Sequence, residues 1–305
     1  MTNYTYAAAY VRSLENGMLN QSELRELAQC RDAQSVMQLL EKKGFSGDNL
    51  TEMLENEQKK VWDTCIELCG DDEPMKALLD ENDYYNIKAV IKAALSGKNA
   101  EEFMLYPSDI DADEIYSSVK TGDFSALDEK TSKICSNAVR IYAESGSAQK
   151  LETYIDRCSG EDFLEKSKCS DFLHGYAELI VLIKNLRIFL RGDKRISEEA
   201  LIPCAGLDID ALKNASSKRD ALEAQGLGAA YDIFDKSPGE FELFCENMIA
   251  DYIEKAKTDF FGFGAVLGYF VGKQTEIRNI RIIASGITFG DGAADISERL
   301  VRGYV

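Results

Sequence analysis

Apolar residues recur along most of the chain at the spacing of an amphipathic α-helix. The first such stripe consists of Ala7, Tyr10, Val11 and Leu14, which share one face because a helix completes a turn in about 3.6 residues. We find no sustained alternation of apolar and polar residues, the pattern that indicates a half-buried strand. Only four prolines interrupt the 305 residues, and proline is the residue that breaks helix interiors. The sequence therefore predicts an all-α protein.

The clearest helix start lies in the segment SPGEFELFCENMIADYIEKA. Ser237 can cap the helix, Pro238 suits the first helical position, and Glu240 would complete a capping box. The predicted buried stripe of this helix then consists of Phe241, Phe244, Cys245, Met248, Ile249 and Tyr252.

An asparagine, an apolar residue and a cation follow one another three times, about a third of the chain apart. The copies are Asn86-Ile87-Lys88, Asn185-Leu186-Arg187 and Asn279-Ile280-Arg281. In each copy, further apolar residues stand three and four positions after the central one, so each is predicted to be the apolar stripe of a helix, flanked by the asparagine and the cation. Each stripe is predicted to stop at a glycine, which commonly ends helices: Gly97, Gly192 or Gly286.

The likeness between copies extends beyond the helices, because Pro107 and Pro203 follow the first two glycines at matching places. One interpretation is three long helices with ordinary core stripes. Tandem triplication of a helical unit also explains the matched prolines and glycines. It predicts three similar domains, 1–107, 108–205 and 206–305, arranged with pseudo-threefold symmetry as a funnel-shaped or ring-like body.

The repeated polar residues are the candidate structural or partner-facing positions. They are Asn86, Lys88, Asn185, Arg187, Asn279 and Arg281. One hypothesis is that the three cations point inward as equivalent groups. The alternative is that they flank core stripes and bond to nearby acids or helix-end carbonyls.

The net charge limits which partners the chain can bind, and the cysteine pattern argues against disulfides and a zinc site. The 53 acidic and 35 basic residues give a formal charge of −18, which opposes binding to nucleic acid or an anionic lipid surface, so a docking partner should present basic groups. The eight cysteines are expected to be free thiols. Cys65 and Cys69 share a helix face, but no further cysteine pair or histidine is placed to complete a zinc site.

The sequence predicts neither export nor a membrane-spanning segment. The N-terminus lacks the basic flank and apolar core of a signal peptide. The longest apolar run, 260–272, is too short to span a bilayer, so no transmembrane segment is expected.

No convergent catalytic set is recognisable. The glycines of GFGAVLG, 262–268, resemble a nucleotide-binding loop, but a helix pattern precedes them where a strand is required. Gly264, Gly268 and Gly272 recur every four residues and predict a helix face suited to close packing. His174 is the only histidine. We expect neither an active site, nor a cofactor, nor a metal.

Four stretches resemble the C subunit of the V-type (A-type) rotary ATPases of archaea and bacteria, the counterpart of the eukaryotic d subunit. AVLGYFVGKQTEIRNIRIIASG is similar to the family's closing helix. ENDYYNIKAVIKAALSGKNAEEFMLYP and AELIVLIKNLRIFLRG resemble its first and second internal repeats. The opening, YAAAYVRSLENGMLNQSELRELAQCRDAQSVMQLLEKKGF, resembles its N-terminal helices.

The resemblance implies an all-helical funnel that caps the membrane ring of proteolipid subunits and receives the central stalk, made of the D and F subunits, at its other end. It implies a cytoplasmic rotor subunit, peripheral on the inner face of the membrane, that transmits torque without hydrolysing ATP or carrying the ion. Two other classes remain: a helical adaptor of the solenoid type, for which a period near a third of the chain is long, and an all-α enzyme.

Overall fold

The computed structural model describes residues 4–192 and 200–305. Within these ranges the regular elements are helices, accompanied by one isolated bridge between Cys204 and Leu207. The prediction of an all-α protein is confirmed. By its contacts the chain forms two compact units, one of Met1–Asp72, Ser170–Ile180 and Leu222–Val305, the other of Glu73–Cys169 and Val181–Ala221. The arrangement as three tandem domains stays a prediction.

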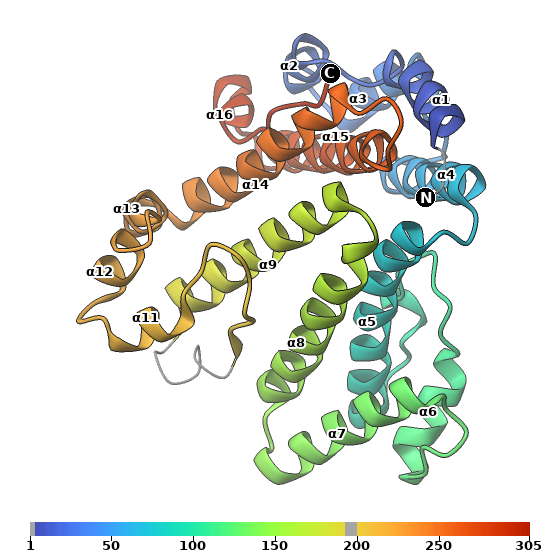
Figure 1. The fold of residues 1–305 in the computed structure, drawn as a ribbon. Helices are drawn as coiled ribbons and strands as arrows, with labels where there is room; N and C mark the ends of the chain where they lie inside the picture. The colour runs from blue at the N-terminus through green and yellow to red at the C-terminus, as the bar shows by residue number, and fades with distance from the viewer. Residues whose placement is uncertain (1–3, 193–199) are drawn as a thin grey trace. The chain divides into compact units, whose positions relative to one another are not determined.

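The first unit is built around one long helix, α15 (Gly264–Phe289) (Figure 1). Every residue from Gly264 to Gly272 is buried, as expected for a helix segment that is apolar on all sides. The helices that contact it are α1 (Thr5–Glu15), α2 (Gln21–Ala28), α3 (Ala33–Glu41), α4 (Leu50–Cys69), α14 (Pro238–Glu254) and α16 (Ala293–Glu298). Helix α13 (Gly228–Lys236) packs on α14.

Helix α14 begins at Pro238, as predicted, and Ser237 is its cap. The Ser237 hydroxyl accepts a hydrogen bond of 3.3 Å from the Glu240 backbone N–H. The predicted second half of the capping box was wrong. The Ser237 N–H already donates to the carbonyl of Ile233, so the Glu240 carboxylate turns to the Lys236 ammonium at 2.8 Å.

The second unit is a bundle around α5 (Glu73–Ser96), which packs on α6 (Ala112–Thr121) and α8 (Ala148–Lys166) (Figure 1). Helix α7 (Glu129–Ser145) packs on α8, and the short α11 (Ile209–Asn214) lies in the later segment of the unit. Two helices, α9 (Asp171–Arg191) and α12 (Lys218–Glu223), contribute residues to both units. The α5 bundle buries Val90, Ile91, Ile115, Cys135 and Leu151 completely or nearly so.

The predicted glycine stops hold for two of the three repeats. Gly97, with φ of 72°, follows the end of α5, and Gly192 follows the end of α9. The prediction for Gly286 was wrong, because α15 continues to Phe289 and ends at the left-handed Gly290, with φ of 80°. Gly286 instead lies where a Cβ atom would meet Ile296 of α16 at 2.6 Å, so its small size is needed for packing.

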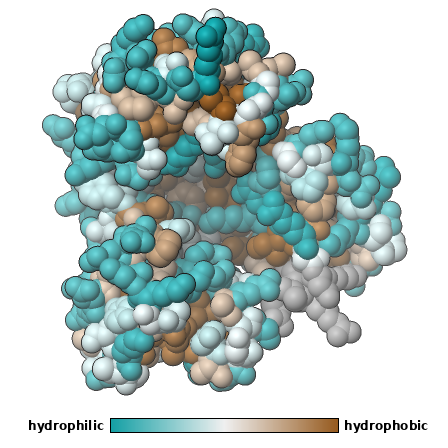
Figure 2. Space-filling view, turned by 180° about the vertical axis from the view of Figure 1, so that it is seen from behind, coloured by the Kyte–Doolittle hydropathy of each residue, from teal (hydrophilic) through white to brown (hydrophobic). Residues whose placement is uncertain are grey.

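The surface is largely hydrophilic. Hydrophilic residues cover most of the face seen in Figure 2, and smaller hydrophobic patches lie between them. Among the described helices, none has the length and apolar character needed to cross a bilayer. All eight cysteines are free thiols, as predicted.

Candidate functional site: three asparagine clamps and a buried ion cluster

The first repeated asparagine, Asn86 on α5, is completely buried and holds a segment that follows the helix. Its Nδ2 donates to the carbonyl oxygen of Leu105 at 2.9 Å, and the N–H of Leu105 donates to its Oδ1 at 2.7 Å. Leu105 lies in an irregular stretch, so the side-chain amide takes the place of a neighbouring backbone. We call this two-bond arrangement an asparagine clamp.

The other two repeats contain the same clamp. Asn185 on α9 donates to the carbonyl of Ile202 at 2.7 Å and accepts from its N–H at 2.9 Å. Asn279 on α15 exchanges two bonds of 2.9 Å with the backbone of Val301. The clamped residues stand 19, 17 and 22 positions after their asparagines.

Buried asparagines are accommodated here because both ends of each amide are satisfied. An unpaired buried amide would cost on the order of 1–3 kcal/mol, whereas a paired one stabilises the fold modestly and directionally. Each clamp also pairs a backbone N–H and a carbonyl in a segment without a strand partner. The recurring sequence pattern thus corresponds to a recurring local structure, at Asn86, Asn185 and Asn279.

The three repeated cations have different surroundings. Lys88 is partly buried, and its Nζ lies 2.6 Å from Oδ1 of Asp156 on α8. Arg187 is partly buried on α9. Arg281 is exposed and donates to the side chain of Gln58 at 3.4 Å. The ion pair of Lys88 has the form expected for a cation that flanks a core stripe, and the convergence of the three cations stays a prediction.

A buried ion cluster joins three parts of the first unit. Lys273 on α15 is only 4% exposed, and its ammonium lies 2.6 Å from the carboxylate of Glu57 on α4. It also pairs with Glu276, one turn along α15. The second oxygen of Glu276 accepts a hydrogen bond of 2.5 Å from the backbone N–H of Leu19, which precedes α2. Charges buried to this degree are tolerated only when paired and hydrogen-bonded, as these are.

The environment of Lys273 fixes its protonation state. Burial alone would lower its pKa, but attraction to Glu276 and Glu57 outweighs that effect and raises the pKa above the ordinary value. The ammonium also lies 4.9 Å from the centre of the Phe45 ring. We did not predict this cluster from the sequence. Its signal was a lysine and a glutamate, three positions apart, directly after the apolar stretch Gly264 to Gly272.

The predicted glycine face of α15 is buried and closely packed. A Cβ atom on Gly268 would meet Ala256 and the hydroxyl of Tyr304 at 2.6 Å, and one on Gly272 would meet the Tyr304 side chain at 2.8 Å. Gly264 packs in the same manner on the ring of Phe172, at 2.9 Å. Because these glycines have no side chain, side chains from other segments can pack directly on the backbone of α15.

Comparison with known proteins identifies the family. The model of the ATP synthase (C/AC39) subunit family matches residues 7–299. The chain is 24% identical to the C subunit of the A-type ATP synthase of Methanosphaera stadtmanae, over 92% of this chain and 83% of that protein. It is 22% identical to the C subunit of the V-type ATP synthase of Thermus thermophilus, over 98% of both chains. The matched residues include the three clamp asparagines, and of the clamped residues only Val301 lies beyond the match. The chain therefore belongs to the ATP synthase (C/AC39) subunit family.

Proposed function

We propose that the chain is a non-catalytic rotor subunit of a V-type ATPase. In this proposal it joins the central stalk, made of the D and F subunits, to the proteolipid ring of the membrane sector and transmits torque for ATP-linked proton or sodium transport. It acts from the cytoplasmic side as a peripheral subunit of the membrane complex. The observation that carries the proposal is the family match over residues 7–299, together with relatives named as C subunits of ATP synthases.

The packing of the chain supports a mechanical role. A part that transmits torque must not yield between the surfaces where force enters and leaves. The asparagine clamps fix irregular segments to long helices by paired hydrogen bonds, and the ion cluster of Lys273, Glu57 and Glu276 joins two helices and a loop. Buried polar groups of this kind are directional, so they resist sliding more than apolar contacts do.

The charge of the chain supports docking on basic partner surfaces. A net charge of −18 attracts basic groups through the long-range field and favours productive orientations, and it contributes more to association rate than to final affinity. Because such attraction is screened, we expect assembly onto ATPase membranes to slow as ionic strength rises above about 0.15 M.

The proposal is tested by removing the chain from ATPase-active membranes and adding it back. Stripped membranes should lose ATP-driven ion uptake, whereas the released catalytic head should still hydrolyse ATP. Uptake should return when the released head is added back together with the purified chain, but not when the head is added without it. The surface variant Asn16→Ala should restore uptake as well as the wild type does. The proposal fails if membranes lacking the chain keep full ATP-driven uptake, or if the isolated chain itself turns over ATP.

A further inference from the structure

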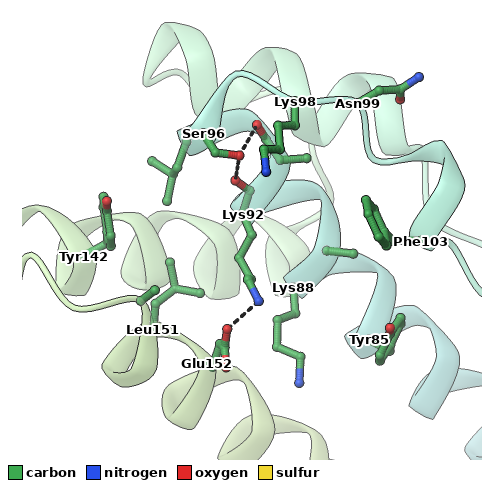
Figure 3. A pocket seen from close by; sticks show the side chains of 14 residues that line it. Tyr85, Lys88, Lys92, Ser96, Lys98, Asn99, Phe103, Tyr142, Leu151 and Glu152 are labelled. Carbon is green, nitrogen blue, oxygen red and sulfur yellow. Dashed lines mark hydrogen bonds and ion pairs between the residues drawn. The ribbon is translucent and has the colours of Figure 1, made fainter.

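A lysine-bearing pocket opens on the second unit, between α5, the segment after it, and the facing ends of α7 and α8. Its volume is about 630 Å³, within the range that accommodates a ligand or several side chains of a partner. Figure 3 shows Phe103 and Tyr85 on one side, Leu151 and Glu152 on the opposite side, and Lys98 at the top between them. All of the lining residues belong to the second unit.

The charge of this pocket is opposite to that of the chain as a whole. Three lysines line it, Lys88, Lys92 and Lys98, whereas Glu152 is its single carboxylate. Lys92 pairs with that Glu152 at 2.5 Å. In a chain of net charge −18, a local excess of cations around an apolar floor is a specific feature that attracts an anionic group.

The three lysines are not equivalent. Lys88 pairs with Asp156, which is not a lining residue, and Lys92 pairs with Glu152, which is. Lys98 is exposed at the rim, and within the described part of the chain no carboxylate lies at ion-pair distance from it. An incoming carboxylate therefore binds Lys98 first. Lys92 can bind the same carboxylate while it stays paired with Glu152.

Two aromatic side chains at the rim are exposed to a degree unusual for their size. Phe103 is 57% exposed and Tyr85 is 42% exposed, and both border the pocket. Aromatic residues accompanied by a polar rim are typical of the centres of protein interfaces. An occupant that covers them removes apolar surface from water and gains about 25 cal/mol for each Å² buried.

We propose that this pocket binds an acidic, amphipathic segment of a partner protein. An apolar side chain of the segment packs against the exposed rings of Phe103 and Tyr85, and a neighbouring carboxylate binds Lys98 and Lys92. The site goes beyond the proposed coupling role, because that role relies on the acidic surface and on basic partners, whereas this pocket selects the opposite charge. Lys98, which has no carboxylate at ion-pair distance within the described residues, and Lys92 beside it set the charge of the occupant.

A photo-crosslinking experiment in intact cells tests the proposal. The full-length chain carries p-benzoylphenylalanine in place of Phe103, the cells are irradiated, and the crosslinked peptide is sequenced by mass spectrometry. We expect a protein segment with apolar residues and at least one Asp or Glu next to the crosslinked position. In the Lys92→Glu/Lys98→Glu background we expect the crosslink yield to fall about tenfold. Lys42→Glu, an exposed lysine of the first unit, is the matched control and should leave the yield unchanged.

Charge exchange completes the test. Replacing the identified acidic residue of the segment by Lys should restore the crosslink in the Lys92→Glu/Lys98→Glu background. The proposal is overturned by a crosslink to lipid, to a second copy of this chain or to a segment without a carboxylate, by a yield that is unaffected by the double substitution, or by no crosslink at all. Co-fractionation of the same variants with ATPase membranes is scored separately, so that a failure of this site is distinguished from a failure of the coupling role.

Discussion

Asn279 and Val301, 22 residues apart, exchange two hydrogen bonds of 2.9 Å in the interior of the first unit. Through them, one side chain of the central helix α15 orients the segment that follows α16. The bonds involve only the backbone N–H and carbonyl of Val301, so they depend on the position of this segment and not on the valine side chain. Asn86 and Asn185 make the same connection elsewhere in the chain.

We expect Asn279→Leu to lower the free energy of unfolding by about 3 kcal/mol, because leucine has a similar volume but leaves the Val301 N–H and carbonyl unpaired. Urea denaturation measures the change. Asn16→Ala removes only a long, exposed hydrogen bond to Ser13 and serves as the control, with an expected effect below about 0.5 kcal/mol. Equal stabilities of Asn279→Leu and the wild type would show that the clamp is energetically unimportant.

Lys273→Met should destabilise the chain by about 4 kcal/mol, because it leaves the buried carboxylates of Glu57 and Glu276 without their cation. The triple variant Lys273→Met/Glu57→Gln/Glu276→Gln should recover part of that loss, since the charges are removed together. Denaturant midpoints of the two variants provide the comparison. A triple variant less stable than the single one would contradict the electrostatic explanation.

The ion cluster should also produce a defined alkaline response. Because the folded-state pKa of Lys273 is raised, its stabilisation is complete below the unfolded pKa of about 10.4 and is lost as pH rises through the folded value. The difference in unfolding free energy between the wild type and Lys273→Met should therefore stay constant from about pH 7 to about pH 10 and shrink above that. A difference that already declines between neutral pH and about pH 9 would assign the effect to other groups.

Gly272→Ala should cost about 2 kcal/mol, because the added methyl group would meet the Tyr304 side chain at 2.8 Å inside a packed core. Gly239→Ala is the matched control: its Cβ atom would lie 3.7 Å from the nearest side-chain atom, the Ser237 hydroxyl, at the exposed start of α14. That substitution should be neutral or stabilising by up to about 1 kcal/mol, since alanine reduces the entropy of the unfolded chain. The melting temperatures of the two variants distinguish steric overlap at Gly272 from a general effect of replacing glycine by alanine. Equal melting temperatures would contradict the packing explanation.

The sequence predicts those features that depend on residue type at a fixed spacing. The helical class, the start of α14 at Pro238 and the three repeated asparagines were all visible in this way. The partners of the asparagines were not, because Leu105, Ile202 and Val301 contribute backbone atoms that any residue possesses.

Two other features depended on tertiary contacts that local patterns do not report. Lys273 has the sequence appearance of a solvated cation, and only the approach of Glu57 from α4 makes its burial favourable. Gly286 looked like a helix end, but contact with α16 gives it a packing role and the helix ends at Gly290 instead.

The order of segments within the first unit has a consequence for synthesis on the ribosome. This unit begins with Met1–Asp72 but is completed only by Leu222–Val305. The nascent N-terminal helices therefore emerge long before the central helix on which they pack, and Glu57 emerges without its lysine. Because domains tend to fold as their chain emerges, the bundle around α5 can mature first, while the apolar faces of α1 to α4 stay uncovered until α15 has been made.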